Sequence, residues 1–189
     1  MKNMIKKIFF IFFFIFYLFI NQSSAENDIM ILQLKDGDVR IELYNDVAPN
    51  HVARFKKLTL EKKYDGVVFH RVIDGFMAQT GDVQFGNSNS EKFDLSRVGT
   101  GGSEYPDLKA EFGDVPHERG TLSMARSSSP DSANSQFFIC FKSATHLDRQ
   151  YTVFGRVVKG MEFVDLIKKG EGSSGKVESP DKIISLSSE

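Results

Sequence analysis

The 189-residue sequence contains no tryptophan, one cysteine and five prolines. A single cysteine cannot form an internal disulfide, so a disulfide-stapled fold is excluded. Cys140 lies inside the apolar run 137–141, and we therefore interpret it as a core residue and not as a redox thiol. We find no internal repeat, and the length allows one domain in addition to a leader.

The sequence also lacks an excess of positive charge. Lysine and arginine number 24 against 25 aspartates and glutamates, whereas a protein that binds nucleic acid needs a basic face. The glycine-rich segment 99–102 is not followed by Gly-Lys-Ser/Thr or directly by a helix-forming segment, so it indicates a surface loop and not a phosphate site. No metal-ligand cluster is recognisable. We expect no nucleic-acid partner and no cofactor.

The longest hydrophobic run stands at the start of the chain. Residues 1–25 begin with three lysines, continue with the apolar run 8–20 and end in small residues at Ala25. This order is typical of a secretory signal peptide, and we expect cleavage after Ala25. The run is shorter than the ~20 residues of a spanning helix, although an uncleaved membrane anchor is the alternative. We expect a mature domain of residues 26–189 in the periplasm, without stable membrane association.

Two apolar-polar segments, 29–34 and 39–44, flank Asp36-Gly37, which predicts a hairpin. Pro49 predicts the start of a helix. Three apolar residues of that helix recur at intervals of three, which predicts a buried stripe of Val52, Phe55 and Leu58.

Two histidines outside the main motifs receive no functional role. We expect His51 to be a surface or capping group and His117, beside Pro116, to be exposed. A second helix is expected to bury Met161, Val164 and Ile167 and to stop at Gly170, before a closing strand over 183–186. Many short strands and two separated helices suggest a closed antiparallel barrel with a helix over each end, although periodicity alone leaves a sandwich open.

The most informative stretch is residues 64–82. Strand alternation puts Phe69 and Arg71 on one face and His70 and Val72 on the other. The chain breaks at residues 74–75 and then resumes as a strand. A guanidinium, a phenyl ring and a side-chain amide can then converge on one surface that holds no obvious nucleophile. Such a surface suits a site that binds a neutral, partly apolar group and polarises it.

This stretch resembles the signature of the cyclophilin-type peptidyl-prolyl cis-trans isomerases, and further blocks follow in the family's order. The blocks are Tyr64, Val67, 69–73, 76–77 and 79–80, then 120–125, 135–139, 147–148 and 153–155. The resemblance covers nearly the whole chain after the leader. It implies a mainly β fold, a closed eight-stranded antiparallel β-barrel capped by two α-helices. It also implies an enzyme, an isomerase that accelerates rotation about X-Pro bonds of proline-containing polypeptides.

The resemblance implies a role for each matching residue. Arg71 matches the catalytic arginine, and Gln79 is expected to bind a substrate carbonyl and to orient Arg71. His70 is expected to point away from Arg71 as a structural or supporting residue. The residues implied to bind substrate are Phe76, Met77, Ala125, Arg126, Gln136, Phe138, His146, Leu147 and Tyr151.

The sequence departs from the family pattern at several positions. His146 stands where many eukaryotic relatives carry tryptophan, so weakened inhibition by the macrocycle cyclosporin is expected. Tyr151 replaces a histidine, which preserves an aromatic ring. Asn134 replaces a glycine and is expected to tolerate a positive φ. Residues 84–97 resemble an insertion relative to shorter bacterial relatives.

The main alternative function is a proline-peptide-binding module or chaperone whose isomerase activity is incidental. An intact set of Arg71, Phe76 and Gln79 favours the enzyme. We expect a monomer that assists protein folding in the cell envelope.

Overall fold

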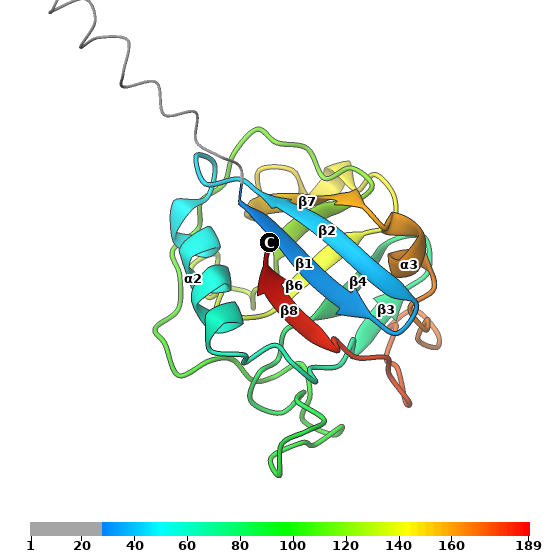
Figure 1. The fold of residues 1–189 in the computed structure, drawn as a ribbon. Helices are drawn as coiled ribbons and strands as arrows, with labels where there is room; N and C mark the ends of the chain where they lie inside the picture. The colour runs from blue at the N-terminus through cyan, green and yellow to red at the C-terminus, as the bar shows by residue number, and fades with distance from the viewer. Residues whose placement is uncertain (1–27) are drawn as a thin grey trace, which may run out of the picture.

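The computed structural model describes residues 28–189. These residues form one sheet of eight strands and two α-helices (Figure 1). The elements are β1 (Ile29–Leu34), β2 (Gly37–Leu43), α2 (Pro49–Leu60), β3 (Arg71–Ile73), β4 (Met77–Thr80), β5 (Thr121–Met124), β6 (Phe137–Cys140), β7 (Val153–Lys159), α3 (Met161–Asp165) and β8 (Ser185–Ser188). The predicted signal peptide and its cleavage site lie outside the described residues. Within residues 28–189, no helix is long and apolar enough to cross a membrane.

The strands are antiparallel and follow the order β3-β4-β6-β5-β7-β2-β1-β8. This confirms the mainly β prediction with eight antiparallel strands and two helices. The prediction of a closed barrel is wrong, because the sheet is curled but open, with β3 and β8 at its two edges. Leu34 pairs with Gly37, so the hairpin turn is Lys35-Asp36, one residue before the predicted one.

Irregular chain, and not a strand ladder, spans the gap between β3 and β8. The backbone N–H of Phe69 donates to Asp181 O at 2.8 Å, and that of Val72 donates to Gly175 O at 2.7 Å. Glycines in 170–175 and Pro180 interrupt regular pairing here, since glycine weakens a strand and proline has no N–H. This seam ties the segment before β3 to the chain that leads into β8.

Helix α2 packs on the sheet as its apolar spacing predicts. Val52, Phe55 and Leu58 are all buried. The Phe55 ring meets the edge of Phe137 at a centroid distance of 5.2 Å and lies 5.3 Å from Tyr64. Figure 1 shows α2 and α3 at opposite sides of the sheet. In α3 the helix ends at Asp165, but Val164 and Ile167 are buried as predicted.

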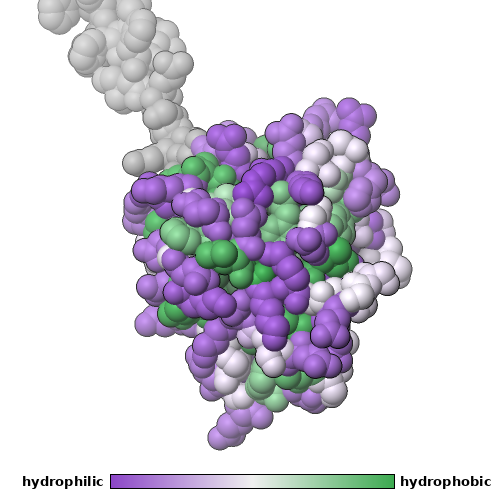
Figure 2. Space-filling view, turned by 90° about the vertical axis from the view of Figure 1, so that its right-hand side faces the viewer, coloured by the Kyte–Doolittle hydropathy of each residue, from purple (hydrophilic) through white to green (hydrophobic). Residues whose placement is uncertain are grey.

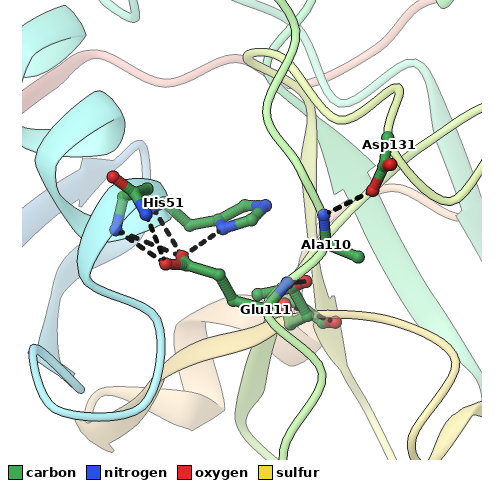
Figure 3. Close-up of polar contacts among 7 residues, drawn as sticks. His51, Ala110, Glu111 and Asp131 are labelled. Atoms are coloured by element: carbon green, nitrogen blue, oxygen red, sulfur yellow. Dashed lines mark hydrogen bonds and ion pairs between the residues drawn. The ribbon is translucent and has the colours of Figure 1, made fainter.

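The prediction for His51 is wrong, because its side chain is completely buried. Figure 3 shows the Glu111 carboxylate at the N-terminus of α2, where it accepts the backbone N–H of Asn50 and of His51. The side chain of His51 also contacts this carboxylate, with Nδ1 2.6 Å from Glu111 Oε2. The residue before the helix is Ala48, whose side chain cannot cap, so Glu111 supplies the missing acceptor and a favourable negative charge.

The predicted alternation through residues 69–72 is also wrong. The strand starts only at Arg71, and both Phe69 and Val72 lie in the main core. The break before β3 lets Phe69 point inward while Arg71 remains partly exposed on the opposite side of the sheet. Arg71 therefore reaches the outer face without sharing that face with Phe69.

Candidate active site

The neighbouring strands β3, β4, β6 and β5 present a pocket of about 190 Å³ on their outer face. Residues on β3, β4 and β6, the residue before β4, the two residues after β5 and the chain at 147–151 meet there. The residues that line it are Arg71, Phe76, Met77, Gln79, Ala125, Arg126, Phe138, Leu147 and Tyr151. All nine belong to the site that the family resemblance implies. Figure 2 shows hydrophobic residues between hydrophilic ones on the side of the molecule where α3 lies.

The floor of the pocket is a small apolar cluster separate from the main core. Met77, Phe138, Cys140, Ala144 and Leu147 form it. The register pairs Met77 with Cys140, and the period of two along the strands sends Met77 and Phe138 to the outer face. Burial raises the pKa of the Cys140 thiol to about 12, so the thiol stays protonated and is no nucleophile. Its predicted burial is confirmed.

Arg71 holds a fixed position at one wall of the pocket without an ion-pair partner among residues 28–189. Its Nε donates to Ser174 O at 3.1 Å, and its Nη1 donates to Gln79 Oε1 at 3.3 Å. Neutral acceptors orient the guanidinium and leave its positive charge uncompensated. The contact with Ser174, about a hundred residues away in the chain, had no signal in the sequence.

A series of side-chain amides links Arg71 to the glycine-rich loop. Gln79 Nε2 donates to Gln136 Oε1 at 3.0 Å. Gln136 Nε2 in turn donates to Gly99 O at 3.0 Å and to Gly101 O at 2.8 Å. Gln136 itself lines an adjoining polar hollow of about 480 Å³, which shares Gln79, Ala125 and Arg126 with the smaller pocket. Gln136, predicted to stand at the pocket rim, therefore lines the hollow and not the small pocket, and the three shared residues lie between the two cavities.

The loop that carries the apparent insertion is anchored by the buried Asp82. Its carboxylate accepts the backbone N–H of Gln84, Phe85, Gly99 and Gly101 at 2.7 to 3.1 Å. Both ends of the 84–97 segment are thus fixed to one side chain.

Asn134 adopts no positive φ, contrary to the expectation. Among residues 28–189, only Lys62 and Arg149 do so outside glycine. Asn134 Oδ1 instead accepts from the Ser103 backbone N–H at 2.7 Å, and its Nδ2 donates to Tyr105 O at 2.9 Å. The amide takes the place of a turn glycine by hydrogen bonding the neighbouring chain.

His146 and Tyr151, the two positions where an aromatic residue of the family pattern is replaced, differ in their exposure and in their distance from the pocket. His146 is exposed and lies outside the lining of the pocket, with its ring 5.5 Å from that of Phe76. Tyr151 lines the pocket and meets Phe138 nearly at right angles, 6.0 Å between centroids. His70 is buried beside Gly99 and does not line the pocket. Burial lowers the pKa of His70, so the ring is neutral near pH 7.

The prediction that His117 is exposed is wrong. Its side chain is fully buried, with Nδ1 2.9 Å from Asp148 Oδ1 and Nε2 3.0 Å from Ser123 Oγ. The order Asp-His-Ser suggests the triad of a hydrolase. Ser123 is itself completely buried, however, and its hydroxyl contacts Thr152 O at 3.0 Å. No substrate carbonyl can reach it, so the three residues form a structural network behind the pocket, with His117 and Ser123 buried and Asp148 partly exposed.

Within the described residues, no group of three or more His, Cys, Asp or Glu side chains could hold a metal ion. The pocket combines an apolar floor, the side-chain amide of Gln79 and the guanidinium groups of Arg71 and Arg126, which have no ion-pair partner among residues 28–189. The site therefore offers an apolar hollow with hydrogen-bond donors beside it.

Residues 29–188 match the family model described as "Cyclophilin type peptidyl-prolyl cis-trans isomerase/CLD". The chain belongs to this family. A probable peptidyl-prolyl cis-trans isomerase of Brucella suis biovar 1 is 61% identical over 163 residues, which are 86% of this chain and 82% of that protein. Peptidyl-prolyl cis-trans isomerase B of Bacillus subtilis is 42% identical over 141 residues, 73% of this chain and 89% of that protein.

Solved cyclophilins share the fold. A crystal structure of a cyclophilin type isomerase from Cryptosporidium parvum has a TM-score of 0.72 and 26% identity, and covers 86% of this chain and 98% of that one. A second structure of that protein was determined in the presence of the dipeptide Ala-Pro, with a TM-score of 0.70, 26% identity and coverage of 84% and 96%. The protein described here is a cyclophilin peptidyl-prolyl cis-trans isomerase.

Proposed function

We propose that the enzyme accelerates X-Pro rotation without covalent chemistry, by binding the twisted amide more tightly than either planar form. Resonance gives the peptide bond a rotational barrier of ~18–20 kcal/mol. A ~10⁵-fold acceleration requires a reduction of about 7 kcal/mol. Only interactions that strengthen as the amide twists contribute to that reduction.

The observation that carries this proposal is the uncompensated Arg71 guanidinium beside an apolar pocket. In the twisted amide the nitrogen becomes pyramidal and regains its lone pair. An N–H of Arg71 that donates to this nitrogen, or to the prolyl carbonyl, stabilises the twist selectively. Gln79 orients Arg71 and binds a substrate carbonyl, while Phe76, Met77, Phe138 and Leu147 hold the pyrrolidine ring.

We assign the remaining substrate residues from the family resemblance. The backbone of Ala125 and Arg126 pairs with the peptide before proline, and Gln136 binds at the edge of the site. Tyr151 contributes an aromatic wall, and His146 extends the rim beside Phe76. His70 supports the site from beneath the loop at Gly99.

The cellular role proposed is folding assistance in the periplasm after removal of residues 1–25. The lysine-rich start and the short apolar run support export. N-terminal sequencing of the protein purified from cells tests cleavage. A start at Glu26 is expected, whereas an intact leader would mean a membrane-anchored enzyme.

The mechanism is tested on residues 26–189 with a proline tetrapeptide whose cis-trans exchange is followed by NMR. Arg71→Ala is expected to lower kcat/KM about 10² to 10³-fold, the usual loss for one electrostatic donor. Arg119→Ala is the matched control, because Arg119 pairs with Asp165 outside the pocket. An Arg71→Ala protein that is folded and fully active would refute the mechanism. One that is inactive but keeps its effect in cells would favour the proline-peptide-binding module.

A further inference from the structure

Arg126 and Arg71 both line the pocket, which contains no acidic residue. They approach it from opposite edges of the four-strand face, Arg71 on β3 and Arg126 as the second residue after β5. Neither arginine pairs with a carboxylate among the residues described. The proposed mechanism uses the charge of Arg71 and leaves that of Arg126 without a function.

Arg126 is held rigidly by neutral groups. Its Nε and Nη2 donate to Gln150 O at 3.3 and 3.1 Å, and its Nη1 donates to Ser127 O at 2.9 Å and to Ser128 O at 3.4 Å. The guanidinium carbon lies 4.4 Å from the centre of the Tyr151 ring. Carbonyl oxygens and an aromatic face orient a cation without cancelling its charge.

The hydrogen-bond inventory of Arg126 leaves one donor over. A guanidinium has five N–H groups, and the contacts to the three carbonyls use four of them. The second N–H of Nη2 has no partner among residues 28–189. Arg126 lines both the small pocket and the larger polar hollow, so its side chain lies where the two cavities meet.

We propose that Arg126 selects substrates with an acidic side chain in one of the two residues before proline. The inference rests on the proposed function, since it takes the small pocket as the proline site. The peptide that precedes a bound proline must then leave that pocket past Ala125 and Arg126, across the boundary of the two cavities. A carboxylate there meets a fixed, unpaired guanidinium that requires little further ordering.

Acidic groups near the site do not oppose this preference at the pocket itself. Asp107 lines the polar hollow, where its Oδ1 accepts from Asn134 Nδ2 at 2.9 Å. Asp148 follows Leu147, but its Oδ1 accepts from the backbone N–H and from the ring of His117. No acidic residue of the pocket lining therefore cancels the charge of Arg126.

The test measures kcat/KM by NMR exchange on tetrapeptides Ala-X-Pro-Phe with X as Glu, Gln or Lys, and on a second set with Glu or Gln one residue earlier. NMR avoids a coupling protease with charge preferences of its own. One partly screened pair of opposite charges predicts that kcat/KM for the Glu peptide exceeds that for the Gln peptide about 3 to 10-fold in at least one set at low salt. The Lys peptide is expected to have a lower kcat/KM than the Gln peptide. The Glu to Gln ratio is expected to shrink toward one in about 0.5 M NaCl.

Three variants locate the origin of the ratio. Arg126→Gln is expected to bring it to about one, and Arg126→Lys to retain most of it, since one unit charge accounts for the effect. Arg156→Gln removes the same charge from β7, where it pairs with Glu42, and is expected to leave the ratio unchanged. The ratio within one variant is compared, so an overall loss of activity does not affect it.

A wild-type ratio of one in both peptide sets, or a ratio that persists in Arg126→Gln, would overturn the inference. The wild-type measurement needs no variant and stays decisive if a variant misfolds. Failure of the proposed mechanism is distinct, because it would appear as full activity of Arg71→Ala on the neutral Gln peptides.

Discussion

His117 Nδ1 lies 2.9 Å from Asp148 Oδ1, and the backbone N–H of His117 donates to the same oxygen at 2.8 Å. The imidazole stacks on Phe138 with ring centroids 6.2 Å apart and planes 16° apart. Asp148 directly follows Leu147, so one buried histidine connects two walls of the pocket, Phe138 and Leu147, that come from different segments. We expect this network to position the walls of the pocket.

Removal of the Asp148 carboxylate is expected to weaken catalysis through these walls. Asp148→Ala leaves the two N–H donors of His117 without an acceptor, a cost of about 1–3 kcal/mol for each buried group. We expect kcat/KM for a proline tetrapeptide to fall about tenfold. Asp148→Asn keeps a carbonyl oxygen for these donors and is expected to lose much less. Equal activities of the two variants and the wild type would show that the network has no positioning role.

The amide series from Arg71 to the glycine-rich loop gives a second prediction. Gln136→Ala removes the acceptor for Gln79 and the donor to Gly99 O and Gly101 O. Freed to rotate, Gln79 would orient Arg71 less precisely, and misplacement of a catalytic group by about 1 Å can cost 10²-fold. We expect kcat to fall more than KM rises in the NMR exchange assay.

The control for this variant is Gln33→Ala, the same truncation on β1, where Gln33 Oε1 only accepts from Ser185. It is expected to retain full activity. A normal kcat for a Gln136→Ala protein of normal thermal stability would show that the amide series does not contribute to catalysis.

The pocket was predictable from sequence because its residues lie in contiguous motifs on short strands. Met77 and Gln79 alternate with the inward Ala78, and the same period of two fixes Phe138 opposite Gln79. Family resemblance then supplied the relation between blocks, which periodicity cannot give.

The errors concern residues whose environment depends on distant partners. His51 and His117 look like polar turn or helix-end residues, yet Glu111 and Asp148 make their burial possible from 60 and 31 residues away. Nothing in local sequence reports such a pair. Phe69 was assigned to the wrong face because a break in the strand before Arg71 interrupts the alternation.

Cyclosporin sensitivity is predicted to depend on His146. The indole N–H of the tryptophan found there in many eukaryotic relatives is a donor to the drug. His146 is exposed beside Phe76, and its smaller imidazole does not place a donor where the indole does. His146→Trp is expected to lower the inhibition constant by about tenfold, the value of one hydrogen bond. Inhibition is measured in the exchange assay, with Lys142→Trp as a control for added aromatic surface. Nanomolar inhibition of the unaltered protein would contradict the prediction.

Acid is predicted to destabilise the fold through its buried histidines. Burial lowers the pKa of His51 and of His117 despite their carboxylate partners, so both are neutral when folded. The unfolded chain binds protons below its ordinary histidine pKa of ~6.5 while the folded chain does not, so stability is complete above that pH and falls below it. Each histidine contributes at most about 1.4 kcal/mol per pH unit. Urea unfolding at pH 7.5 and 5.5 measures the loss, which is expected to be smaller in His51→Gln. Because glutamine cannot titrate, an undiminished loss in that variant would exclude His51 as a source.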